Sequence, residues 1–105
     1  MIDYWIERFK LEILPSLLSD FKAETVIVFG SRVSGTPIAE SDIDVMVISN
    51  YFANISFLKR MPLLLKEIPF PKHVDYIYYT PKEFEKQKAS STIIIEALES
   101  GLRIA

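Results

Sequence analysis

Residues 25–31 read TVIVFGS and residues 41–48 read SDIDVMVI. Each stretch holds a short apolar run rich in β-branched residues, which is typical of a strand that is buried on both faces. A glycine and a serine directly follow the first run, and an Asp-Ile-Asp group stands at the head of the second. We therefore expect two buried strands, over residues 25–29 and 43–49, with polar groups where the first ends and the second begins.

Helical patterns occupy much of the remaining chain. Apolar residues spaced three and four apart predict a helix over residues 3–21, which Asp3 can cap and which Pro15 should kink or restart. A second apolar stripe predicts a helix over residues 57–68, and Pro62 is expected to mark its start.

A third strand is expected over residues 73–79, with Asp75 on the same face as Ile77 and Tyr79. The other predicted elements are a helical turn after Ser31, a loop around residues 35–37, a helix opening at Thr80-Pro81, a helix over residues 91–100 that Gly101 ends in a left-handed conformation, and a short final strand within residues 102–105. Three core strands that alternate with helices indicate a small α/β fold.

The composition narrows the class of protein. The chain has 105 residues, of which 50% are apolar and 25% are charged, and it carries a net charge of −2, which favours one folded domain. Direct DNA binding is not expected, because a polyanion-binding protein normally carries a basic excess. No membrane contact is expected either, since no apolar run approaches the ~20 residues of a membrane span. The absence of cysteine excludes thiolate metal sites and favours a reducing cytoplasm.

Three aspartates are candidate metal ligands. Asp42 and Asp44 are two residues apart, so on an extended chain their side chains leave from the same face. Two carboxylates this close repel each other unless a cation lies between them, and Mg²⁺ prefers one or two carboxylates together with substrate phosphates. If the third strand neighbours the second, Asp75 completes a cluster that could hold two metal ions ~3.5–4 Å apart.

The turn after the first strand is a candidate phosphate site. Gly30 lets the backbone turn sharply and approach a ligand, and amides at the start of the following helical turn can face phosphate groups. The Ser31 hydroxyl can add a hydrogen bond, Arg32 is a candidate second phosphate contact, and Gly35 keeps the loop thin.

Each of these motifs also has a structural interpretation. An Asp-x-Asp pair is often a solvated loop acid, a Gly-Ser pair is usually only a turn, and Asp75 could occupy an exposed edge position. Their joint occurrence beside apolar strands favours a site. An unpartnered carboxylate in the apolar and aromatic strand around Asp75 would also be costly.

The two motifs together resemble the signature of the DNA polymerase β nucleotidyltransferase superfamily, in which a Gly-Ser pair precedes an Asp-x-Asp group. Here ten residues separate Gly30-Ser31 from Asp42-Ile43-Asp44. Residues 30–35 (GSRVSG), 41–45 (SDIDV) and 97–101 (ALESG) look like the minimal nucleotidyltransferase branch. The resemblance implies a small mixed β-sheet flanked by helices, with residues 1–105 as one minimal nucleotidyltransferase domain.

The resemblance also assigns roles to individual residues. Gly30 and Ser31 would hold a nucleoside triphosphate such as ATP. Asp42 and Asp44 would bind two Mg²⁺ ions, and Asp75 would join them and help to activate the acceptor hydroxyl. The sequence differs from many relatives at Ser34, where they have arginine.

The length suggests how an acceptor is supplied. Larger relatives carry an added acceptor-binding domain, so we expect a partner protein, or self-association as a homo-oligomer, to provide that surface. Members of the minimal branch are commonly paired with a helical HEPN-domain protein, often a ribonuclease toxin, and some transfer AMP to a tyrosine of it. The leading hypothesis is a Mg²⁺-dependent antitoxin of this kind. The alternatives are an antitoxin that acts by binding alone, which Ser34 favours mildly, and a transferase acting on a small molecule.

Overall fold

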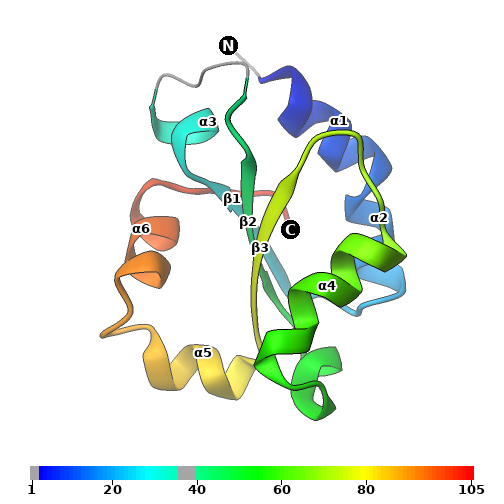
Figure 1. The fold of residues 1–105 in the computed structure, drawn as a ribbon. Coiled ribbons are helices and arrows are strands. Elements are labelled where there is room, and N and C mark those ends of the chain that lie inside the picture. The colour runs from blue at the N-terminus through cyan, green and yellow to red at the C-terminus, as the bar shows by residue number, and fades with distance from the viewer. Residues whose placement is uncertain (1–2, 36–39) are drawn as a thin grey trace.

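Four strands form one mixed sheet in the order β3-β2-β1-β4 (Figure 1). The computed structural model describes residues 3–35 and 40–105. The strands are β1 (Thr25–Phe29), β2 (Ile43–Ile48), β3 (Val74–Tyr79) and β4 (Leu102–Arg103). β2 runs parallel to β3, whereas β1 runs antiparallel to both β2 and β4. The predicted small mixed sheet flanked by helices is therefore confirmed.

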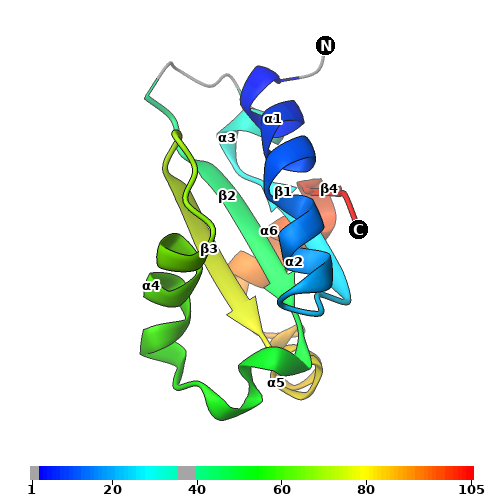
Figure 2. The same ribbon diagram turned by 90° about the vertical axis from the view of Figure 1, so that its right-hand side faces the viewer.

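Helices lie on both faces of this sheet, as Figure 2 shows from the side. Their bounds are α1 (Tyr4–Glu12), α2 (Leu14–Ser19), α3 (Ser31–Ser34), the 3₁₀-helix η1 (Asn50–Asn54), α4 (Phe57–Glu67), α5 (Pro81–Gln87) and α6 (Thr92–Ser100). No helix within residues 3–35 and 40–105 has the length and apolar character needed to cross a membrane. Part of the predicted loop around residues 35–37 lies outside the described residues.

The alternation of side chains along the strands divides the core into two. Val28, Val45 and Tyr76 pack with residues of α1, α2 and α4 on one face of the sheet. Ile27 and Met46 belong to a second cluster with residues of α6 on the other face. The second cluster is smaller and contains fewer helix residues. This second face, which also carries Asp44 and Asp75, is the one that concerns function.

The first predicted helix is present, with a break where proline was expected to cause one. Asp3 caps α1 by accepting hydrogen bonds from the backbone amides of Trp5 and Ile6. The chain then restarts at Leu14 as α2, with Pro15 in its first turn, where the missing N–H costs nothing.

Two local predictions were wrong. Pro62 lies inside α4, which begins five residues earlier at Phe57, because the packing of its buried Arg60 and Leu64 outweighs the unfavourable proline. Gly101 has an extended backbone with φ −81° and not a left-handed one. Glycine is required there for space, since an added Cβ would lie 2.6 Å from the Ile27 side chain.

Candidate active site

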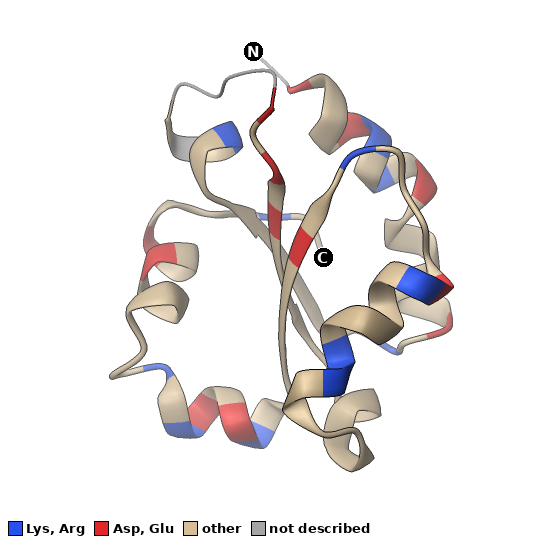
Figure 3. Ribbon diagram, in the orientation of Figure 1, with Lys and Arg blue, Asp and Glu red and all other residues tan. Residues whose placement is uncertain are grey.

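Asp44 and Asp75 lie directly beside each other on neighbouring strands. The parallel register of β2 and β3 pairs these two residues. Cross-strand partners project from the same face of a sheet, so both carboxylates leave it on the face of the second core cluster. Figure 3 shows acidic positions side by side on the two strands. The expectation that the third strand neighbours the second is confirmed.

Asp42 completes the group of acids. It is exposed and directly precedes β2, two residues from Asp44. Burial, together with the negative charges of Asp75 and Asp42, raises the pKa of Asp44 from 3.8 to about 6. The three acids that the sequence singled out therefore share one electrostatic environment.

Gly30 places the turn after β1 against these acids. It precedes α3 and has φ +83°, a backbone conformation that side chains rarely adopt. A Cβ added at Gly30 would collide with Oδ2 of Asp44 and would lie 3.0 Å from its Cγ. Ser31 follows as the first residue of α3, with an exposed side chain. The glycine is thus required both by its backbone angle and by the proximity of an acid.

Arg32 already has partners within the protein. Its guanidinium forms an ion pair with Asp3 at 3.0 Å, and its Nε donates a hydrogen bond to the Ser41 carbonyl at 2.8 Å. The Arg32 side chain is only 7% exposed. A phosphate contact by Arg32 stays a prediction, and it would have to share the guanidinium with these partners.

Gly35 differs from Gly30 in its steric surroundings. Its backbone is extended, and among the described residues a Cβ added there would meet only ordinary contacts, with Ser31 at 3.5 Å and beyond. A role for Gly35 in nucleotide binding remains a prediction. The side chain of Ser34, the position at which the sequence departs from many relatives, lies outside the described residues.

A nucleotidyltransferase domain profile matches residues 10–103. The chain belongs to this nucleotidyltransferase family. A candidate nucleotidyltransferase from Sulfolobus solfataricus, solved by crystallography, is 28% identical in sequence and has a similar structure, with a TM-score of 0.60. The similarity covers 78% of this chain and 72% of the other. No protein of curated function matches the sequence.

Family membership establishes the coarse activity. Nucleotidyltransferases act on nucleoside triphosphates, and their domains generally use divalent metal ions. The resemblance drawn from Gly30-Ser31 and Asp42-Ile43-Asp44 is thereby confirmed, and the minimal branch is consistent with it. The structure brings the two motifs together, because Gly30 lies against Asp44, and it pairs Asp75 of the third strand with Asp44.

The acids of this nucleotidyltransferase suit a hard divalent cation. Among the described residues, no three carboxylate, histidine or cysteine side chains are gathered closely enough to form a complete ligand set. Mg²⁺ does not require one, because it usually takes one or two carboxylates and completes its shell with water and substrate phosphates. Burial raises the pKa of Asp44 most, and repulsion by the neighbouring acids adds to it; a bound cation would relieve that repulsion. The donor set therefore fits the metal that the family implies.

Glu96 is a neighbour of the site that sequence reasoning missed. It lies on α6, and its charge also raises the pKa of Asp44. Sequence spacing gave no reason to select it, because the local pattern of α6 is that of an ordinary amphipathic helix. Only the packing of α6 over the sheet, through Ile94 and Ala97, brings Glu96 towards β2.

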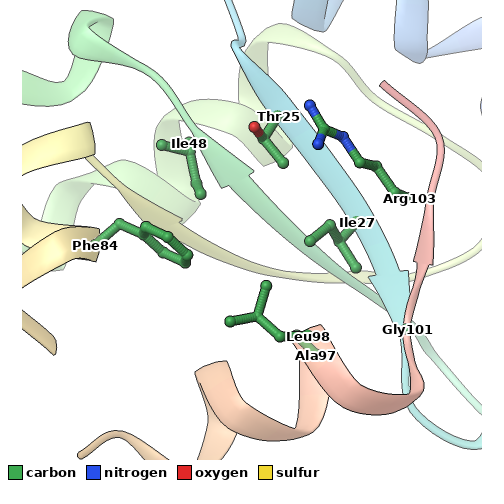
Figure 4. A pocket seen from close by; sticks show the side chains of 8 residues that line it. All are labelled: Thr25, Ile27, Ile48, Phe84, Ala97, Leu98, Gly101 and Arg103. Carbon is green, nitrogen blue, oxygen red and sulfur yellow. The ribbon is translucent and has the colours of Figure 1, made fainter. Parts of the chain in front are cut away.

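A hollow of about 320 Å³ on the same face is a less suitable site. It is mostly apolar, and Figure 4 shows the side chains around it. Its lining consists of Thr25, Ile27, Ile48, Phe84, Ala97, Leu98, Gly101 and Arg103, and includes none of the three aspartates. A triphosphate with metal ions needs the carboxylates, so the acids and the Gly30 turn define the candidate active site.

Proposed function

We propose that this nucleotidyltransferase moves AMP from ATP onto a hydroxyl group of a protein. The acceptor oxygen would attack the α-phosphorus, and the bond from that phosphorus to the oxygen bridging to the β-phosphate would break, releasing pyrophosphate. The observation that supports this proposal most is the paired position of Asp44 and Asp75, with Gly30 packed against Asp44. The turn proposed to bind phosphate and the residue proposed to accept the proton both lie beside Asp44.

The three aspartates and the Gly30-Ser31 turn have distinct roles in this proposal. Asp42 and Asp44 would hold Mg²⁺, with two ions expected, and Asp75 would join them and accept the proton of the acceptor hydroxyl. Gly30 and Ser31 would hold the triphosphate through backbone amides and the serine hydroxyl. When bound, Mg²⁺ would supply neutralisation of the charge that develops on the phosphate oxygens.

The proposed acceptor is a tyrosine of a HEPN-type toxin, which the transfer would silence. Resemblance to the minimal branch supports this choice of partner. The structure adds that Asp42 and Asp75 are exposed, so a hydroxyl carried on the surface of a second protein can reach them. A buried site would instead have favoured a small acceptor.

Transfer of label tests the proposal directly. The chain would be incubated with ATP labelled at the α-phosphate, Mg²⁺ and a helical partner protein encoded beside it that carries an Arg-x4-6-His type motif. We expect covalent label on the partner with the wild-type chain and none after Asp42→Asn together with Asp44→Asn. Asp20→Asn, which changes an exposed acid at the end of α2, is the matched control and should leave the transfer unchanged. Absence of label with every nucleoside triphosphate would overturn the proposal.

A second candidate function is neutralisation of the toxin by binding alone. Ser34 favours it, because many relatives have a phosphate-binding type of residue, arginine, at that position. The same double variant separates the two. If it still protects cells from the toxin while no partner becomes adenylylated, binding is the mechanism. If protection of the cells is lost together with the label, nucleotidyl transfer is the mechanism.

A further inference from the structure

One arginine joins three segments that are distant in the sequence. Arg32 belongs to α3, directly after the Gly30-Ser31 turn. It pairs with Oδ2 of Asp3 at 3.0 Å and donates from Nε to the carbonyl of Ser41 at 2.8 Å. Ser41 immediately precedes Asp42. The guanidinium of Arg32 therefore connects the Gly30-Ser31 turn, the segment that leads into Asp42, and the start of α1.

The Arg32 and Asp3 side chains are held in place by burial and by hydrogen bonds. The side chains of Arg32 and Asp3 are 7% and 15% exposed, so water competes weakly for their charges. Asp3 uses its two oxygens separately: Oδ1 accepts from the backbone amides of Trp5 and Ile6, and Oδ2 binds Arg32. Because the cap fixes the carboxylate and the planar guanidinium offers donors in fixed directions, the position of Ser41 relative to α3 is fixed too.

We propose that Arg32 and Asp3 are positioning residues that set the separation between the Gly30-Ser31 turn and Asp42. The proposal rests on the proposed function, in which the turn holds phosphates and Asp42 holds a cation. Asp3 is the N-cap of α1 and is negatively charged like a phosphate, so it acts through Arg32 and not on the nucleotide.

A direct contact between Arg32 and phosphate predicts the opposite outcome. In that case Asp3 would compete with the nucleotide for the guanidinium, and removing the charge of Asp3 would tighten nucleotide binding. If Arg32 positions the turn and Asp42, removing that charge loosens both, and transfer slows. Removing the charge of Asp3 therefore separates the two roles: tighter nucleotide binding indicates a phosphate contact, and slower transfer indicates a positioning role.

Asp3→Asn is the variant that tests this sign. Asparagine is as good an N-cap as aspartate, so α1 keeps its cap while the ion pair is lost. We expect kcat of the label-transfer reaction to fall about tenfold, because displacing a catalytic group by about 1 Å can cost up to ~10²-fold. Arg32→Lys keeps the charge but cannot reproduce both contacts, and should lower kcat in the same direction. A lowered KM with unchanged kcat in Asp3→Asn would overturn the proposal.

The matched control is Glu12→Gln on the same helix. Glu12 pairs with Arg8 at 2.6 Å on the surface, so this change removes an equal charge and one ion pair at the other end of α1. It should leave kcat and KM within about twofold of the wild type. An equal loss in both variants would assign the effect to α1 in general and reject the proposed positioning.

Amide hydrogen exchange gives an answer that does not depend on activity. In the protein without nucleotide, Asp3→Asn should speed exchange at residues 41–44 and 30–34 at least several-fold, and Glu12→Gln should not. If the wild type transfers no nucleotide while this difference is seen, the proposed function fails and the structural connection stands. If exchange at these residues is the same in all three proteins, the positioning role is rejected.

Discussion

Gly30 and the carboxylate of Asp44 occupy adjoining space at the end of β1. Gly30→Ala would force a side chain into a left-handed backbone and against Oδ2 of Asp44. We expect a loss of about 1–3 kcal/mol in the free energy of unfolding from the backbone strain. Displacement of Asp44 should also reduce the rate of nucleotidyl transfer by about 10²-fold. Urea denaturation and the label-transfer assay measure the two effects.

Gly35→Ala is the control for that substitution. The backbone at Gly35 is extended, and a Cβ there meets only ordinary contacts within the part of the chain that the structure describes. A compatible glycine-to-alanine change stabilises a protein by about 0.4–1 kcal/mol through the unfolded chain. Equal losses of stability in the two variants would contradict the steric explanation for Gly30.

At the scale of elements, a buried arginine holds α4, β3 and α5 together. Arg60 is 3% exposed, donates to the carbonyls of Ile55 and Tyr78, and binds both carboxylate oxygens of Glu83. The capping box between Thr80 and Glu83 fixes that carboxylate at the start of α5. Arg60 therefore connects α4 to β3 and to α5, the helix that follows β3.

Arg60→Met should be strongly destabilising. It leaves two carbonyls and part of a carboxylate without their donor, and removal of one partner of a buried ion pair costs about 3–5 kcal/mol. Because Glu83 is 36% exposed, we expect a loss of about 3 kcal/mol in the free energy of unfolding, at the lower end of that range. The check is the free energy of unfolding in urea.

Arg8→Met provides the comparison, because Arg8 pairs with Glu12 on the surface. The Arg8→Met variant should lose less than about 1 kcal/mol in the free energy of unfolding. Should the two arginine variants unfold at the same urea concentration, burial would not be what makes Arg60 important.

At the scale of the whole molecule, the charge of the site opposes folding. Burial and the nearby acids raise the pKa of Asp44 to about 6, above its value of 3.8 in an unfolded chain. Between these values the folded protein binds more protons than the unfolded one, so the free energy of unfolding falls as the pH rises from about 4 to about 6.

The pH dependence can be assigned to Asp44 by substitution. Solvent screening of this partly exposed group should reduce the effect to about 1 kcal/mol. In EDTA, Asp44→Asn should remove most of this decline and make the protein more stable than the wild type at pH 7. Added Mg²⁺ should stabilise the wild type more than the variant. Thermal unfolding across this pH range is the measurement, and identical pH profiles would contradict the assignment.

Local sequence patterns predicted the strands well because both faces of β1 and β2 are apolar. Alternation also placed Asp75 on the face opposite Val74 and Tyr76, which pack in the larger core cluster. These features depend on neighbours in the sequence, which a single chain displays.

Features that depend on packing could not be predicted in the same way. The helix around Pro62 persists because Arg60 and Leu64 are buried, and Glu96 reaches the site only because α6 lies over the sheet. The pairing of Arg32 with Asp3 spans 29 residues of sequence. Each is set by three-dimensional neighbours, and no local pattern identifies them.

The hydrogen-bond ladder between β2 and β3 has a consequence for any attempt to redesign the enzyme. Asp44 and Asp75 are cross-strand partners, so the distance between their α-carbons is determined by main-chain geometry and is insensitive to changes in other side chains. Only the reach of the acids can be altered, one methylene at a time, by exchanging aspartate for glutamate. The spacing between these two proposed catalytic carboxylates is therefore adjustable in steps and not continuously.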